Sequence, residues 1–76
     1  MDWKPIVAAN LRRLRAEKRL SQEEVAHRVA VSVGYYSQLE RGRRNMTVDI
    51  LARIADALGV DLAALVGPVS ADPAQR

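Results

Sequence analysis

The side chains best suited to chemistry gather between residues 32 and 45, and that chemistry is hydrogen bonding and charge neutralisation. Hydroxyl and amide groups are followed there by guanidinium groups: Ser32, Ser37, Gln38, Arg41, Arg43 and Arg44. A glutamine amide donates and accepts hydrogen bonds together, which suits the edge of a nucleic-acid base. Guanidinium groups neutralise phosphates. The pattern predicts a surface that binds a polyanion.

Groups that could carry out catalysis or hold a metal are sparse. The chain has one histidine, His27, and no cysteine, so a thiolate metal site and a disulfide are both excluded. His27 with Glu23 or Glu24 does not make a metal constellation, and the four glycines are isolated rather than gathered in a phosphate-binding loop. We expect no enzyme activity, no metal, no cofactor and no small-molecule ligand.

Charge is unevenly distributed along the chain. The total is only +3, yet residues 1–45 carry ten basic and five acidic side chains, whereas residues 46–76 carry two and four. A basic front half beside a mildly acidic, apolar back half indicates a polyanion-binding surface and a separate packing or pairing surface. The alternative is a solvated charged face with no partner.

Length and composition limit the chain to one small helical domain. At 76 residues there is room for one core, and 49% of the residues are apolar with no phenylalanine, so aliphatic side chains build the interior. The opening MDWKPIVAAN lacks the apolar run of a signal peptide, and no stretch reaches the ~20 apolar residues that span a bilayer. We expect a soluble, cytoplasmic protein without a membrane partner.

Capping residues and apolar spacing predict five helices. Pro5 suits a first helical turn, Ser21 begins a capping box, and Ser32, Thr47 and Asp61 are further N-cap candidates. The expected helices cover residues 5–18, 22–29, 33–41 and 48–58, with a short last helix containing Leu62 and Leu65. We expect a folded domain over residues 1–66 and a flexible C-terminal tail over residues 67–76.

Two of these helices form a helix-turn-helix, because residues 22–29 and 33–41 are joined only by Ala30-Val31-Ser32. The strings LRRLRAEKRLSQEEVA, YYSQLERGRRN and ILARIADALGV, in this order, closely resemble the lambda-repressor and Cro-like helix-turn-helix family, also called the XRE family. The resemblance covers roughly residues 10–65. Within the family, the short single-domain layout and ERGRRN before Thr47 are most similar to controller proteins of restriction-modification systems, although many phage and cellular repressors share these features.

The resemblance implies a compact all-α, five-helix DNA-binding domain that acts as a sequence-specific transcription regulator of bacterial or phage type. One recognition helix spans only a few base pairs, so a homodimer on a palindromic operator is the expected form, with the third helix in the major groove. The expected partners are double-stranded DNA and a second copy of the chain, and the bound protein would be associated with the nucleoid.

By family position, base contacts fall on the N-terminal half of the third helix. A helical wheel turns Tyr36 and Leu39 inward and the polar side chains outward. Gln38 could pair bidentately with adenine, or be an ordinary exposed polar residue, and Val33 could meet a thymine methyl group. The residues assigned to base contact are Ser32, Val33, Gly34, Ser37 and Gln38.

Phosphate contacts are expected at both ends of the recognition unit. Gln22 begins the second helix, where its amide and the free N–H groups could hold a phosphate, or where it could serve the cap alone. Four arginines, Arg12, Arg13, Arg19 and Arg28, are expected to be solvated charges. The residues assigned to phosphate contact are Gln22, Tyr35, Arg41, Arg43, Arg44 and Asn45.

The resemblance also implies an ion pair between Arg15 and Glu40, and the chain departs from the family pattern elsewhere. Ala30 takes a turn position that is often glycine, which implies about 1 kcal/mol of strain or an altered turn. Tyr36 replaces a branched aliphatic residue, and its hydroxyl needs a partner, such as a phosphate at the edge of the protein. Trp3 is expected to pack on the core, with an exposed aromatic side chain that meets a partner as the alternative.

A small apolar patch near the C-terminus is the expected dimer interface, with simple closure of the core as the alternative. The residues assigned to it are Val60, Leu62, Leu65 and Val66. The rival function is a protein-interaction module, such as an antitoxin or anti-repressor, that uses the same fold to hold a protein partner. The basic cluster over residues 41–44 favours DNA.

Overall fold

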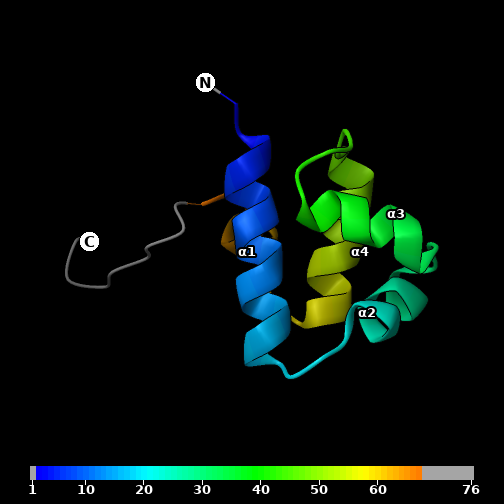
Figure 1. Ribbon diagram of the computed structural model, residues 1–76. Helices are drawn as coiled ribbons and strands as arrows, with labels where there is room; N and C mark the ends of the chain where they lie inside the picture. Colours follow the sequence, from blue (N-terminus) through cyan, green and yellow to red (C-terminus); the bar gives the residue numbers. More distant parts are fainter. Residues whose placement is uncertain (1, 68–76) are drawn as a thin grey trace.

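The computed structural model describes residues 2–67, which form helices and contain no strand. The helices are α1 (Lys4–Glu17), α2 (Gln22–Val29), α3 (Val33–Glu40), α4 (Val48–Leu58) and α5 (Leu62–Val66). In Figure 1, α3 crosses in front of α4 and above α2. Helix α1 packs against α3 and α5, and α4 packs against α2 and α5. The predicted five-helix architecture is confirmed, with bounds that differ by one residue in α1 and α3. Apart from Gly67, the expected tail over residues 67–76 lies outside the described residues.

Side-chain caps start the helices where the sequence places them. Ser21 and Glu24 form the predicted capping box: Ser21 Oγ accepts from the Glu24 N–H at 3.0 Å, and Glu24 Oε1 accepts from the Ser21 N–H at 2.8 Å. The hydroxyl groups of Ser32 and Thr47 each accept a backbone N–H from three residues further on, at 3.1 Å. Asp61 occupies the N-cap of α5, but its side chain makes no cap hydrogen bond.

Four helices end in the same backbone turn, in which one residue adopts a left-handed conformation. Those residues are Arg19, Ala30, Gly42 and Gly59, with φ of 57°, 68°, 68° and 69°. At the end of α2, for example, the Val31 N–H donates to the Ala26 carbonyl at 3.0 Å, the long hydrogen bond of a Schellman motif. Ala30 thus takes the conformation that its position predicts, and its Cβ makes that conformation unfavourable.

Replacing Ala30 with glycine should therefore stabilise the protein by about 1 kcal/mol, because glycine adopts positive φ without a steric penalty. A gain of that size raises the Tm of a domain this small by about 4–8 °C, measurable by circular dichroism. The matched control is Ala52→Gly on the exposed face of α4, where the same change should instead lower stability by about 0.5–1 kcal/mol. Equal effects of both variants would contradict the strain at Ala30.

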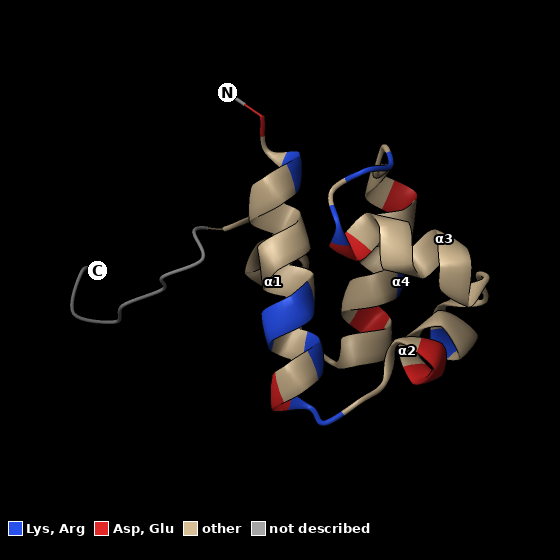
Figure 2. Ribbon diagram, in the orientation of Figure 1, with Lys and Arg blue, Asp and Glu red and all other residues tan. Residues whose placement is uncertain are grey.

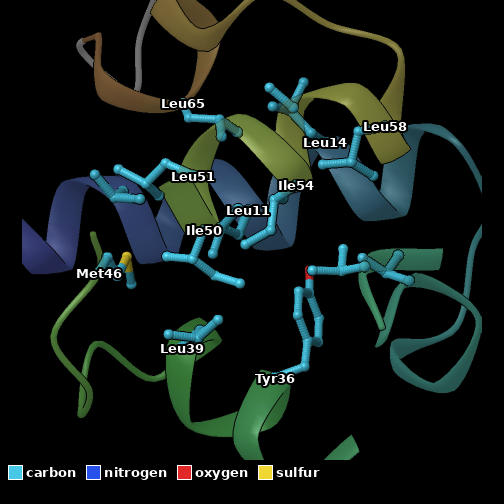
Figure 3. Packing of buried hydrophobic residues seen from close by; sticks show 14 of the residues in the cluster. Leu11, Leu14, Tyr36, Leu39, Met46, Ile50, Leu51, Ile54, Leu58 and Leu65 are labelled. Atoms are coloured by element: carbon cyan, nitrogen blue, oxygen red, sulfur yellow. The ribbon is translucent and has the colours of Figure 1, made fainter. Parts of the chain in front are cut away.

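The core is aliphatic and has one aromatic ring, that of Tyr36, as Figure 3 shows. Leu11, Leu39, Ile54 and Leu65 are fully buried with it. The assignment of Leu65 to the dimer interface is therefore wrong, because a side chain with 0% exposure offers nothing to a partner. The helix that carries Leu65, α5, is attached to the rest of the domain by a contact that the sequence did not predict.

That contact comes from Asn10, a buried polar residue of α1. Its Nδ2 donates to the carbonyl oxygens of Leu65 at 2.7 Å and Gly67 at 2.8 Å. These are carbonyls at the C-terminal end of α5, which has no further helical turn to satisfy them. Asn10 thus attaches the last short helix to the first one.

Trp3 packs less completely than expected. Its side chain remains 46% exposed and lines an apolar hollow between the start of α1, the start of α4 and the end of α5. The other lining residues are Val7, Met46, Val48, Leu51 and Val66. Within residues 2–67, no helix has both the length and the apolar character needed to cross a membrane.

Candidate nucleic-acid interface

Helix α3 divides into a buried face and an open face. Tyr36, Leu39 and Glu40 are buried against the rest of the domain, as the helical wheel predicts for the first two. The opposite side of the helix, which we term the open face, is accessible to solvent toward its N-terminal end, where Val33 is 45% exposed. The helix is therefore held by one side and leaves the other free for a flat or grooved partner.

The residues assigned to base contact lie on or beside this open face, and they differ in exposure and in the hydrogen bonds that they already make. Ser32, Val33 and Gly34 are exposed, and Ser37 and Gln38 are half-buried. The Ser32 oxygen already accepts the Tyr35 N–H as a helix cap, which leaves its own hydrogen and one lone pair for another partner. A Cβ added at Gly34 would meet nothing within 4 Å, so the protein itself does not require glycine at this position.

Gln38 is engaged by an arginine from the segment that follows α3. Arg44 Nε donates to Gln38 Oε1 at 2.6 Å, and the Arg44 guanidinium lies 5.4 Å from the centre of the Tyr35 ring. Arg44, which was assigned to phosphate contact, therefore contacts both Gln38, assigned to base contact, and Tyr35, assigned to phosphate contact. The sequence carries no local signal for this contact, because the three residues come together only through the turn at Gly42.

The segment after α3 is the main concentration of free positive charge near the open face. Arg41, Arg43, Arg44 and Asn45 are all exposed. Figure 2 shows basic residues on this segment, and others on the C-terminal half of α1 and the loop after it. Helices α2 and α4 each carry two acidic residues, and the others are spread singly over the rest of the described chain. The exposed residues Arg41, Arg43 and Arg44 thus form a positively charged segment at the C-terminal end of α3, which we term the basic border.

Three of the arginines expected to be solvated charges have partners within the protein. Arg12 Nη1 donates to the Glu40 carbonyl, and Arg13 Nη1 pairs with Glu17 Oε2 at 3.0 Å. Arg28 Nη1 donates weakly to the Ala57 carbonyl at 3.5 Å. Arg12 in particular fixes the C-terminal end of α3 to α1, so it positions the open face.

The predicted ion pair is present and forms the centre of a buried polar cluster. Glu40 Oε2 accepts from Arg15 Nε at 2.5 Å, and Oε1 accepts from Arg15 Nη2 at 3.1 Å. Gln22 Nε2 donates to the same Oε1 at 2.9 Å. Burial opposes ionisation of Glu40, but the hydrogen bonds from Arg15 and Gln22 outweigh it and lower the pKa of Glu40. The hydrogen bond to Glu40 and the charge of its carboxylate in turn raise the pKa of Arg15.

Gln22 therefore has a structural role that the sequence did not reveal, since one of its amide hydrogens serves Glu40. A second amide hydrogen and the amide oxygen remain for other partners. Glu23 and Glu24 lie in the first turn of α2, and their charges oppose an anion at that helix end. The phosphate contact of Gln22 stays a prediction.

The hydroxyl of Tyr36 cannot serve the expected phosphate contact. The side chain is completely buried, and its oxygen has no hydrogen-bond partner within the described part of the chain. Burial raises the pKa of this hydroxyl, and the nearby Glu40 carboxylate raises it further. Tyr36 thus remains neutral beneath the open face and supports α3 through its ring.

Within residues 2–67, no three histidine, aspartate or glutamate side chains converge on a position that could hold a metal ion. The open face of α3 and its basic border are the features with a geometry suited to binding a polyanion.

Comparison with known proteins places the same features in a family. The helix-turn-helix family model HTH_3 matches residues 11–65. A protein of Sinorhizobium fredii described as an uncharacterized HTH-type transcriptional regulator, y4dJ, is 51% identical over 73 residues, which cover 96% of this chain and 95% of that one.

Two solved structures have the same arrangement of helices. The hypothetical transcription factor NHTF from Neisseria is 36% identical, with a TM-score of 0.85 over 88% of this chain and 77% of that one. The restriction-modification controller protein C.AhdI from Aeromonas hydrophila is 33% identical, with a TM-score of 0.78 over 80% of this chain and 92% of that one.

Proposed function

Because the chain belongs to the HTH_3 helix-turn-helix family of DNA-binding transcriptional regulators, we propose that two copies of it bind a palindromic operator. In this proposal α3 enters the major groove in each half-site. The operator is double-stranded DNA, and the protein acts in the cytoplasm where that DNA is reached. A role as a controller of a restriction-modification system is a narrower prediction, supported by the similarity to C.AhdI.

The observation that carries the proposal is the division of α3 into a buried and an open face. Tyr36 and Leu39 hold the helix against the core while Val33, Gly34 and Gln38 stand on its outer side. A helix held in this way can enter a groove about 12 Å wide without exposing the core. The open face supplies the base contacts, and the basic border supplies the phosphate contacts.

The pairing surface is proposed near the C-terminal end of the described chain. Leu62 and Val66 are 37% and 52% exposed, and Val66 lines the apolar hollow beside Trp3 and Val48. Val60 is partly buried against the core and contributes only an edge. A second copy that covers these side chains would bury a small apolar patch and set the spacing of the two α3 helices.

Selection of bound duplexes from a random DNA pool, with purified protein at near-physiological salt, tests the proposed function. A two-fold symmetric enriched site would support a dimeric regulator that reads sequence. A folded, dimeric protein that enriches no sequence would exclude that function. The remaining hypothesis would then be that the fold binds a protein partner, as in an antitoxin.

Salt dependence offers an independent check on the basic border. Replacing Arg43 with alanine should make the plot of log K against log salt less steep by about 1.8, because each lost phosphate contact removes about 0.9 and a dimer loses two. Binding should weaken by the same factor on all sequences. The measurement is a titration of a fluorescent duplex at several salt concentrations.

The matched control is Arg28→Ala, since the Arg28 side chain lies toward the end of α4 and donates to the Ala57 carbonyl. This variant should keep the salt dependence of the original protein. An equal change in both variants would mean that charge attracts DNA without a localised border.

A further inference from the structure

Gln38, Arg44 and Tyr35 form one connected group on the open face of α3, which we term the Gln38 cluster. Arg44 Nε donates to Gln38 Oε1 at 2.6 Å, a short hydrogen bond between a cation and a carbonyl oxygen. The guanidinium carbon of Arg44 lies 5.4 Å from the centre of the Tyr35 ring, within the range of a cation–π contact. Arg44 is thus held from two sides.

The backbone turn after α3 explains why Arg44 reaches back to Gln38. The Gly42 N–H donates to the Leu39 carbonyl and the Arg43 N–H to the Gln38 carbonyl, both at 3.0 Å. This is a Schellman motif with Gly42 in the left-handed position at φ 68°. It turns the chain back toward the last turns of α3, and the next residue is Arg44.

The hydrogen bond to Arg44 decides which way the Gln38 amide points. A free glutamine amide can rotate by half a turn and exchange its donor and acceptor ends. Rotation in the Gln38 cluster would bring the amide nitrogen against Arg44 Nε, which places a donor against a donor. The amide is therefore held with Oε1 toward Arg44 and the two hydrogens of Nε2 directed elsewhere.

This orientation changes the base edge that suits Gln38. Bidentate pairing with adenine needs the amide oxygen to accept from the adenine amino group. In the Gln38 cluster Arg44 already occupies one lone pair of that oxygen. An adenine amino group on the other lone pair would lie beside the positively charged guanidinium, which disfavours this pairing. Guanine instead presents two acceptors, O6 and N7, which suit the free Nε2 hydrogens of Gln38 and the remaining N–H groups of Arg44.

We propose that Arg44 is a positioning residue for specificity: it holds the Gln38 amide so that the open face of α3 reads guanine rather than adenine. Arg44 acts on the base preference through Gln38, in addition to any phosphate that it neutralises. The inference rests on the proposed function, because it concerns which base that function selects.

The test compares the sequences enriched from a random duplex pool by the original protein, Arg44→Ala and Arg43→Ala. The position read by Gln38 is the one whose preference disappears in Gln38→Ala. We expect guanine there for the original protein, and a shift toward adenine by about tenfold for Arg44→Ala, in which the amide is free to turn. Arg43→Ala is the matched control, because it removes the same charge from the neighbouring residue and should leave guanine preferred.

The outcomes separate this inference from the proposed function. Adenine at that position in the original protein, or an Arg44→Ala variant that weakens all sequences equally, would overturn the role of Arg44 while sequence-specific binding stands. No enriched sequence for the original protein would overturn both. Circular dichroism of each variant checks that it remains folded, as expected for substitutions of side chains outside the core, since Arg43 and Arg44 are exposed and Gln38 is half-buried.

Discussion

Replacing Glu40 with alanine is expected to lower the free energy of unfolding by about 3–5 kcal/mol. Its carboxylate is 2% exposed and accepts three hydrogen bonds, two from Arg15 and one from Gln22. Removal leaves the Arg15 guanidinium partly buried without its counter-charge, which is more costly than the loss of the contact itself. A chain of 76 residues has about 4–11 kcal/mol of stability in total, so this loss would remove a large share of it.

Chemical denaturation followed by circular dichroism measures this effect, and Glu17→Ala is its matched control. Glu17 also pairs with an arginine, at 3.0 Å from Arg13, but this pair is exposed on one helix face. Its loss should change stability by less than about 0.5 kcal/mol. Similar losses in the two variants would mean that burial does not set the importance of the Glu40 pair.

The same ion pair predicts a dependence of stability on pH. The folded protein lowers the pKa of Glu40 below its ordinary value of 4.5, so the carboxylate contributes stability above that value. This contribution is lost as the pH falls from about 4.5 through the lowered pKa. Glu24, whose pKa is lowered by the hydrogen bond from the Ser21 backbone, titrates in the same window. Glu40→Gln should therefore flatten the acid limb of the stability curve only in part.

Replacing Gln38 with alanine is expected to remove about 1–3 kcal/mol of base discrimination in each half-site. On a two-fold operator the loss is about 2–6 kcal/mol, which corresponds to a Kd at least about 30-fold weaker. The physical reason is that the alanine methyl group offers no hydrogen bond to a base edge. Titration of the selected duplex and of a scrambled duplex, by fluorescence anisotropy, should show a loss on the first and little change on the second.

Gln22→Ala is the matched control, because it makes the same substitution at the start of α2. Gln22 faces Glu40 and the expected phosphate rather than a base, so its loss should weaken both duplexes alike. If Gln38→Ala also weakened both duplexes alike, Gln38 would be a backbone contact.

Local chemistry explains why the helices could be predicted closely. Caps such as Ser21 with Glu24, and Thr47, act within three residues, so their signal is present in the sequence itself. The turn at Ala30 was likewise predictable, because its position calls for positive φ whichever residue occupies it. The burial of Tyr36 and Leu39 follows from helical periodicity alone.

Contacts between residues distant in sequence explain what could not be predicted. Asn10 bonds to carbonyls 55 and 57 residues away, and nothing near Asn10 in the sequence indicates those partners. Gln22 joins the Arg15–Glu40 pair through tertiary packing, and only family resemblance pointed to the pair itself. Leu65 was misplaced for the same reason: in a helix of five residues, periodicity does not distinguish a core side chain from a surface one.

The half-exposed position of Trp3 gives the protein an optical reporter of its own. It is the only tryptophan in the chain, and its indole lines the apolar hollow beside Val48 and Val66. Indole fluorescence moves to shorter wavelengths when the ring leaves water. A molecule that covers the hollow, whether a second copy or another protein, would therefore shift the emission spectrum of unlabelled protein, and dilution would reverse the shift.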